Sequence, residues 1–173
     1  KDSMIQAYKK KYPRYAEYAI YAAMIESVDE GVGRIINSLK GKNLLENTMI
    51  IFYSDNGGIF QSTLMPSLHG YKGQLYEGGI RVPLAISWKG KIKENSICHE
   101  PVTGTDFFPT LAALAGITIQ NKLDGQNILP LLLQQDGFSR ELICWHFPVY
   151  SPSREKSDPH KTTPCAAIRK LPI

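Results

Sequence analysis

The chain places a carboxylate and a carboxamide directly after a short apolar run. Residues 49–53 (MIIFY) are all hydrophobic, and Ser54, Asp55, Asn56 and two glycines follow them. Asp and Asn offer hard oxygen ligands and no sulfur or imidazole nitrogen, a donor pair that suits Ca²⁺ or Mg²⁺. The same residue types are also typical of an Asx–Gly turn after a strand. By itself, the motif leaves both interpretations open.

A second polar segment, residues 68–84 (LHGYKGQLYEGGIRVPL), contains one lysine between glycines. The neighbouring glycines would let Lys72 approach an anion closely, and its ammonium is a compact point charge. The spacing does not match a phosphate-binding loop of the G-x-x-x-x-G-K-[ST] type. In isolation, a lysine in such a loop is more often an ordinary surface residue.

The elements that would position these residues follow from hydrophobic periodicity. Apolar residues recur every three or four positions over 14–40, which predicts an amphipathic helix that ends near Gly41. Residues 49–53 do not alternate, which predicts a buried strand in a parallel sheet. We further predict strands at 82–88 and 141–147, and a helix that is capped by Thr105 or Asp106 and ends at Gly116.

This order of elements indicates an α/β fold, and in such sheets ligands gather at the carboxyl ends of the strands. Asp55 and Asn56 follow the strand predicted at 49–53, so they are expected at such an end.

Composition indicates a globular domain of 173 residues, with 43% apolar and 21% charged residues. The net charge of +4 is scattered, and we interpret the basic cluster at 8–14 as a solvated helix end rather than a nucleic-acid surface. Apolar runs fall well short of the ~20 residues of a membrane span. The three cysteines lack C-x-x-C spacing and support neither a disulfide framework nor a zinc site.

Together, S-D-N-G (54–57) and G-x-K-G-x-x-x-E-G-G-x-R-V-P (70–83) strongly resemble the motifs of type I sulfatases. These arylsulfatase-like enzymes belong to the alkaline phosphatase superfamily, and the resemblance extends from about residue 15 to residue 147. It implies an α/β fold: part of an alkaline-phosphatase-like, mixed or mostly parallel sheet flanked by helices. We expect 1–138 to be the C-terminal portion of the catalytic domain and 139–173 the truncated start of a small C-terminal α+β subdomain.

The resemblance assigns roles to three residues. Asp55 and Asn56 would be ligands of the catalytic Ca²⁺, which is favoured over Mg²⁺. Lys72 would bind a sulfate oxygen and the bridging oxygen of the ester, and would stabilise negative charge on the leaving group.

Two histidines are weaker candidates for substrate binding. His69 stands where related sequences often have arginine, and its alternative role is to pack on Tyr71. His146 occupies a strand end that often contributes to the substrate pocket in this family, and its alternative role is packing in the core or at a hinge.

The family nucleophile is a formylglycine made from Cys or Ser in a C/S-x-P-x-R motif. No cysteine of the chain begins that motif, and the similar stretch 150–154 (YSPSR) has Tyr150 in the position of the nucleophile. We therefore expect the formylglycine in an N-terminal part absent from this sequence, and we expect the chain alone to be inactive.

The resemblance implies hydrolysis of aryl or carbohydrate sulfate esters. The alternatives are phosphoester hydrolysis by the same superfamily, and a catalytically inactive fragment or binding module. We expect a sulfated small molecule or carbohydrate as substrate, no nucleic-acid partner, no membrane span, and self-association through exposed sheet edges. A periplasmic, lysosomal or secreted location follows from the family alone.

Overall fold

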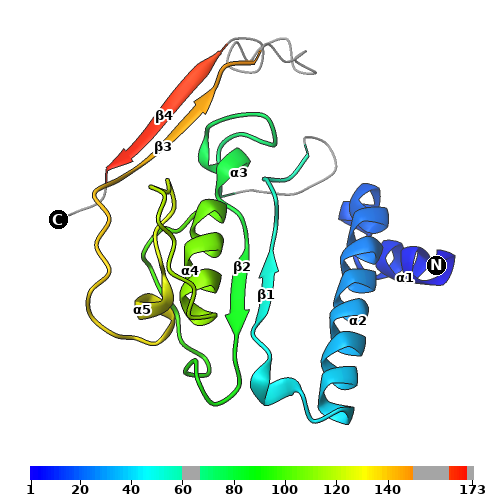
Figure 1. Cartoon of the computed structure of the whole chain (residues 1–173). Coiled ribbons are helices and arrows are strands. Elements are labelled where there is room, and N and C mark those ends of the chain that lie inside the picture. Colours follow the sequence, from blue (N-terminus) through cyan, green and yellow to red (C-terminus); the bar gives the residue numbers. More distant parts are fainter. Residues whose placement is uncertain (60–66, 150–163, 171–173) are drawn as a thin grey trace.

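The computed structural model describes residues 1–59, 67–149 and 164–170. The stretch 150–154 (YSPSR), which is similar to the formylglycine motif, lies outside these ranges. Two short sheets and several helices follow one another along the chain (Figure 1). In order they are α1 (Asp2–Lys11), η1 (Pro13–Tyr18), α2 (Ala19–Gly41), η2 (Leu45–Asn47), β1 (Ile50–Tyr53), α3 (Glu77–Ile80), β2 (Leu84–Ser87), η3 (Gly104–Asp106), α4 (Phe107–Leu114), α5 (Leu129–Leu132), β3 (Leu142–Phe147) and β4 (Cys165–Lys170).

The long amphipathic helix predicted over 14–40 is confirmed as η1 followed by α2. Its end differs from the prediction, because Gly41 remains helical and the left-handed residue is Asn43, with a φ of 57°. Asn adopts this conformation at low cost because its short polar side chain hydrogen-bonds locally.

The strands predicted at 49–53 and 82–88 are confirmed as β1 and β2, but they pair antiparallel, with Ile51 opposite Ile86. The expectation of a parallel strand is therefore wrong for this pair. Tyr53, the last residue of β1, lies opposite Leu84, the first residue of β2, and the two arrows point in opposite directions in Figure 1. In the part of the chain that the structure describes, both sheets are two-stranded and antiparallel.

The expectation that this strand is buried is also wrong within the chain. Phe52 is 45% exposed and Tyr53 is 38% exposed. In Figure 1, α2 and α4 lie on opposite sides of the β1–β2 pair. Much of the apolar face of α2 is exposed as well, at Tyr21, Met24, Ile25, Val28 and Ile35.

The helix predicted after residue 105 is confirmed as α4, and Gly116 follows it with a φ of +70°. Of the two predicted caps, Asp106 is the N-cap of α4, although its side chain makes no capping hydrogen bond to that helix. The turn that precedes α4, η3, is capped by Thr103. Thr103 and Asp106 form a capping box, in which each side chain accepts a hydrogen bond from the other residue's backbone N–H.

The strand predicted at 141–147 is confirmed as β3, which pairs antiparallel with β4. Burial alternates along β3, with Ile143 buried and the neighbouring Leu142 and Cys144 exposed. The hairpin therefore has an inward face and an outward face. No helix among the described residues is both long and apolar enough to cross a membrane.

Candidate metal and anion site

Two loops meet where β1 ends and β2 begins. The backbone N–H of Gly57 donates to the Gly79 carbonyl at 3.0 Å, and that of Lys72 donates to the Gly58 carbonyl at 2.9 Å. The structure therefore joins the loop of Asp55 and Asn56 to the loop of Lys72.

Close backbone packing explains two glycines of the motifs. A Cβ on Gly57 would lie 1.8 Å from the Gly78 carbonyl oxygen, and one on Gly78 would lie 2.0 Å from the Gly70 carbonyl oxygen. Since real Cβ atoms do not approach this closely, any side chain at either position would push the loops apart. The N–H of Gly78 also donates to the His69 carbonyl at 2.7 Å, which joins α3 to the start of the lysine loop.

Asp55 and Asn56 form a turn with outward-facing polar groups. Asp55 is exposed and Asn56 is half-buried. The Asn56 carboxamide donates to the Asp55 carboxylate, and the Ser54 hydroxyl donates to the Asn56 carbonyl at 3.0 Å. The turn and the metal interpretations are therefore compatible, because a hydrogen-bonded turn presents both side chains together.

The donor chemistry of Asp55 and Asn56 fits part of a calcium shell. Ca²⁺ takes about six to eight oxygen ligands, and these side chains supply a carboxylate and a carboxamide oxygen. Within the described ranges, no group of three or more His, Cys, Asp or Glu side chains could hold a metal ion. By themselves, these two side chains would supply only part of a calcium shell.

The side chain of Lys72 is exposed, while its backbone is fixed by the bond to Gly58. A residue that the sequence interpretation missed supports the same loop. Gln74 is only 2% exposed, and its side-chain oxygen accepts the N–H of Tyr71 at 2.9 Å. A buried amide that binds the backbone beside Lys72 limits the freedom of this loop.

His69 lies in the lysine loop, and its ring meets the Tyr76 ring edge-on, with centroids 4.3 Å apart and planes at 71°. The ring contact that the structure gives His69 is thus with Tyr76, and packing on Tyr71 stays a prediction. His69 remains partly accessible in the same loop as Lys72, so a contact with substrate stays a prediction.

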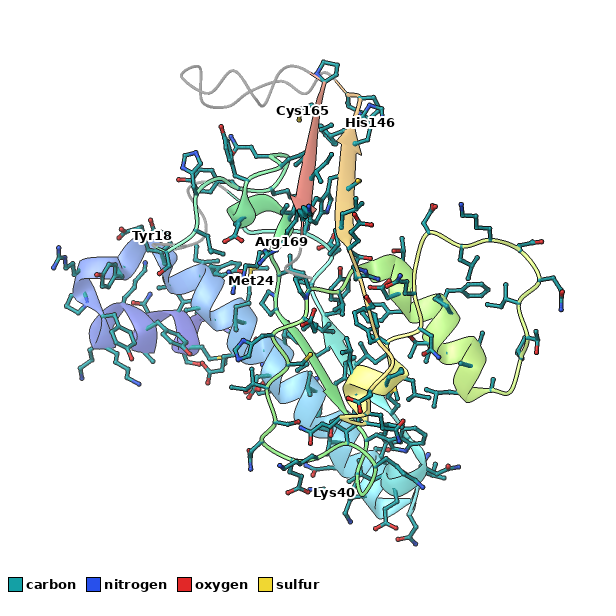
Figure 2. All side chains as sticks on the ribbon, turned by 90° about the vertical axis from the view of Figure 1, so that its left-hand side faces the viewer. Tyr18, Met24, Lys40, His146, Cys165 and Arg169 are labelled. Atoms are coloured by element: carbon teal, nitrogen blue, oxygen red, sulfur yellow. The ribbon has the colours of Figure 1, made fainter. Side chains whose placement is uncertain are left out.

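His146 lies near the end of β3, opposite Ala166 of β4 (Figure 2). It is exposed, so the alternative of core packing is wrong. By the alternation of β3, it occupies the outward face, whereas Arg169 shares the inward face with Ile143. His146 is therefore not on the inward face of the hairpin, the face from which Arg169 extends.

Glu77, the first residue of α3, connects the lysine loop to the hairpin. Its carboxylate lies 3.1 Å from the Arg169 guanidinium of β4 and 3.3 Å from that of Arg81. Glu77 is the glutamate of the second sulfatase-like motif, and nothing in the local sequence indicates a partner on a distant strand.

A buried ion pair lies next to Phe107, the residue that contacts Tyr53 at the end of β1. The Arg140 guanidinium donates to both carboxylate oxygens of Asp106, at 2.6 and 2.9 Å, and their side chains are 6% and 0% exposed. Asp106 also accepts the N–H of Gln126 at 2.9 Å and that of Thr103 at 2.7 Å. The next residue, Phe107, meets the Tyr53 ring edge-on at 4.9 Å, one residue before the S-D-N-G turn.

The electrostatics of Asp106 follow from these contacts. Burial is the largest influence and by itself raises the pKa of this carboxyl group. Hydrogen bonds from Arg140, Gln126 and Thr103 together outweigh it and hold the pKa of Asp106 below its usual value. The carboxylate is therefore the stable form of Asp106 in the folded protein at neutral pH.

Comparison with known proteins gives matches over most of the chain. Residues 2–117 match the sulfatase family, and residues 69–169 match the C-terminal region of N-sulphoglucosamine sulphohydrolase. A sulfatase of Formosa agariphila is 38% identical over 164 residues, which are 86% of this chain and 30% of that protein. The chain thus spans under a third of the length of this relative.

Solved structures agree with the sequence matches. The crystal structure of Ps i-CgsB in complex with k-i-k-neocarrahexaose superposes with a TM-score of 0.69 at 34% identity, covering 78% of this chain and 30% of that one. A phosphonate monoester hydrolase of Agrobacterium radiobacter gives a TM-score of 0.67 at 28% identity, covering 88% and 31%. The chain therefore shares its fold with part of each of these enzymes.

Proposed function

The chain belongs to the sulfatase family, and from this membership we propose that it supplies the calcium-ligand pair and the leaving-group lysine of an enzyme that hydrolyses sulfate esters. The observation that carries the proposal is the pair of backbone hydrogen bonds between the loops of Asp55–Asn56 and Lys72. They place hard oxygen donors and a cation on adjoining loops.

Each of these residues has a defined part in the proposed reaction. Asp55 and Asn56 would hold Ca²⁺, which when bound neutralises charge on the sulfate oxygens. The Lys72 ammonium stabilises the negative charge that develops on the bridging oxygen as the S–O bond breaks. We assign no residue of this chain as the nucleophile, since the C/S-x-P-x-R motif that yields formylglycine in this family is absent from its sequence.

For the substrate, we propose a carbohydrate sulfate in preference to an aryl sulfate. The support is the similarity to Ps i-CgsB, whose structure was determined in complex with k-i-k-neocarrahexaose. His69 is the residue of this chain that we place nearest such a substrate, because it shares the loop of Lys72.

A second candidate is hydrolysis of phosphonate or phosphate esters. It is favoured by the likeness to the phosphonate monoester hydrolase of Agrobacterium radiobacter. A tetrahedral phosphonate monoester also carries negative oxygens, so a lysine and a hard cation suit both substrates.

The test is ester hydrolysis by the protein that carries this chain and by its Lys72→Ala variant. We expect sulfate release from sulfated oligosaccharides to exceed phosphate or phosphonate cleavage, and the variant to lose about 100- to 1,000-fold in kcat, as for other lost transition-state contacts. Lys89→Ala is the matched control, because Lys89 pairs with Glu46 outside both loops. Unchanged sulfate release in Lys72→Ala would refute the role of Lys72, and faster phosphonate cleavage would favour the second candidate.

A further inference from the structure

We infer that Glu77 is a positioning residue, through which the β3–β4 hairpin sets the placement of the Lys72 ammonium. The inference rests on the proposed function, because it concerns the same lysine. It assigns a role in catalysis to an ion pair between two segments that are 92 residues apart in the sequence.

The first step is the carboxylate itself. Glu77 uses its two oxygens for two guanidinium groups: Oε1 lies 3.1 Å from Arg169 Nη1, and Oε2 lies 3.3 Å from Arg81 Nη1. Arg81 is one turn further along the same short segment, whereas Arg169 belongs to β4. The contact with Arg169 is therefore the one that ties the lysine loop to a separate element.

The second step is the hairpin, from which Arg169 reaches Glu77. Arg169 lies opposite Ile143 in the register of β3 and β4, and Ile143 is 7% exposed. Side chains directly opposite each other share a face of the sheet, so Arg169 leaves the hairpin on its packed, inward face. Figure 2 shows Arg169 toward the centre of the molecule, with His146 and Cys165 at the far end of the hairpin.

The third step runs from Glu77 to Lys72 through backbone atoms. Gly78 and Gly79 follow Glu77, and their backbones bond to the His69 carbonyl at 2.7 Å and to the Gly57 N–H at 3.0 Å. A Cβ on Gly79 would lie 2.0 Å from the Gln74 carbonyl oxygen. Because the backbones are packed this closely, a shift of α3 would also shift the loop that carries Lys72.

These steps predict a particular kinetic signature. Exposed ion pairs contribute little to global stability, and the Glu77 and Arg169 side chains are each 47% exposed. Displacing a catalytic group by as little as 1 Å costs up to about 100-fold in rate. Loss of the Glu77–Arg169 contact should therefore lower kcat while leaving the protein folded. The effect should be largest for esters with poor leaving groups, which depend most on charge stabilisation by Lys72.

The experiment compares Glu77→Gln, Arg169→Gln and the double variant in the protein that carries this chain. Aryl sulfates whose phenols span a range of pKa values serve as probe substrates in place of the carbohydrate sulfate, because only their leaving group then varies. We expect each single variant to lower kcat about 10-fold for the poorest leaving group and to steepen the dependence of log kcat on leaving-group pKa, and we expect the double variant to be no worse. Glu46→Gln, which breaks the exposed pair with Lys89 away from both loops, should change nothing.

A uniform loss across all leaving groups, or parental rates in Arg169→Gln, would overturn the inference. A second readout separates its failure from failure of the proposed function. We expect the Lys72 and Gly78 amides to exchange hydrogen several-fold faster in Glu77→Gln and Arg169→Gln than in the parent or in Glu46→Gln. If the parent cleaves no sulfate ester, the proposed function fails, and unchanged exchange at these amides refutes the positioning link independently.

Discussion

Replacing Arg140 by methionine would leave the carboxylate of Asp106 buried without its cation. Asp106 has no exposed surface and Arg140 is 6% exposed, so water cannot take over the missing contacts without local opening. Removing one partner of a buried ion pair costs about 3–5 kcal/mol. Because the N–H groups of Thr103 and Gln126 still bind Asp106, we expect a loss near the lower end, about 3 kcal/mol at pH 7.

The sign of the pH dependence distinguishes this explanation from simple loss of packing. In the parent, the pKa of Asp106 is lowered in the folded state, so its contribution is present above the unfolded pKa and is lost as the pH falls through the folded pKa. In Arg140→Met, burial is no longer offset by the cation, and the folded pKa of Asp106 moves upward. Protonation then removes the penalty, so the difference between variant and parent should shrink from pH 7 toward pH 4.

The assay is urea unfolding of the protein that carries this chain, measured at several pH values. Hydrogen exchange at the Gln126 and Thr103 amides, which donate to Asp106, reports the same site locally. Lys89→Met is the control, because it breaks an exposed ion pair that is worth at most about 1 kcal/mol. A loss below about 1 kcal/mol for Arg140→Met, or a loss that does not change with pH, would refute the reasoning.

Three further predictions concern the loops and the chain as a whole. Gly57→Ala should destabilise the protein by about 3 kcal/mol or more in thermal unfolding, because its Cβ would lie 1.8 Å from a carbonyl oxygen, whereas Gly41→Ala, with open space around it, should not. Asp55→Ala should weaken calcium retention at least about 10-fold in equilibrium dialysis, and retention equal to the parent's would exclude Asp55 as a ligand. The 173-residue chain alone should release no sulfate and should self-associate in sedimentation velocity, since Phe52 and several side chains of α2 are exposed. A monomer that melts cooperatively, or measurable turnover by the isolated chain, would contradict the last expectation.

Local patterns in the sequence predicted several features of the molecule. The three- and four-residue spacing over 14–40 predicted the long helix, and the apolar runs predicted β1, β2 and β3. The motifs around Asp55 and Lys72 indicated the family, which the comparisons confirm. These features depend on residues within a few positions of each other, where period and residue type are informative. The helix α1 and the strand β4 were not predicted.

Other features depend on contacts between distant segments, and only the tertiary structure decided them. The antiparallel pairing of β1 and β2 places Ile51 opposite Ile86, and no hydrophobic period in either segment encodes that strand direction. Three such features are the burial of Gln74, the ion pair of Asp106 with Arg140, and the ion pair of Glu77 with Arg169. The local sequences of these residues are those of ordinary loops and strand ends. The local sequence of a polar residue is the same whether its side chain is solvated or is paired with a residue 92 positions away, as Glu77 is. Its contribution to stability depends on which groups the folded chain places next to it.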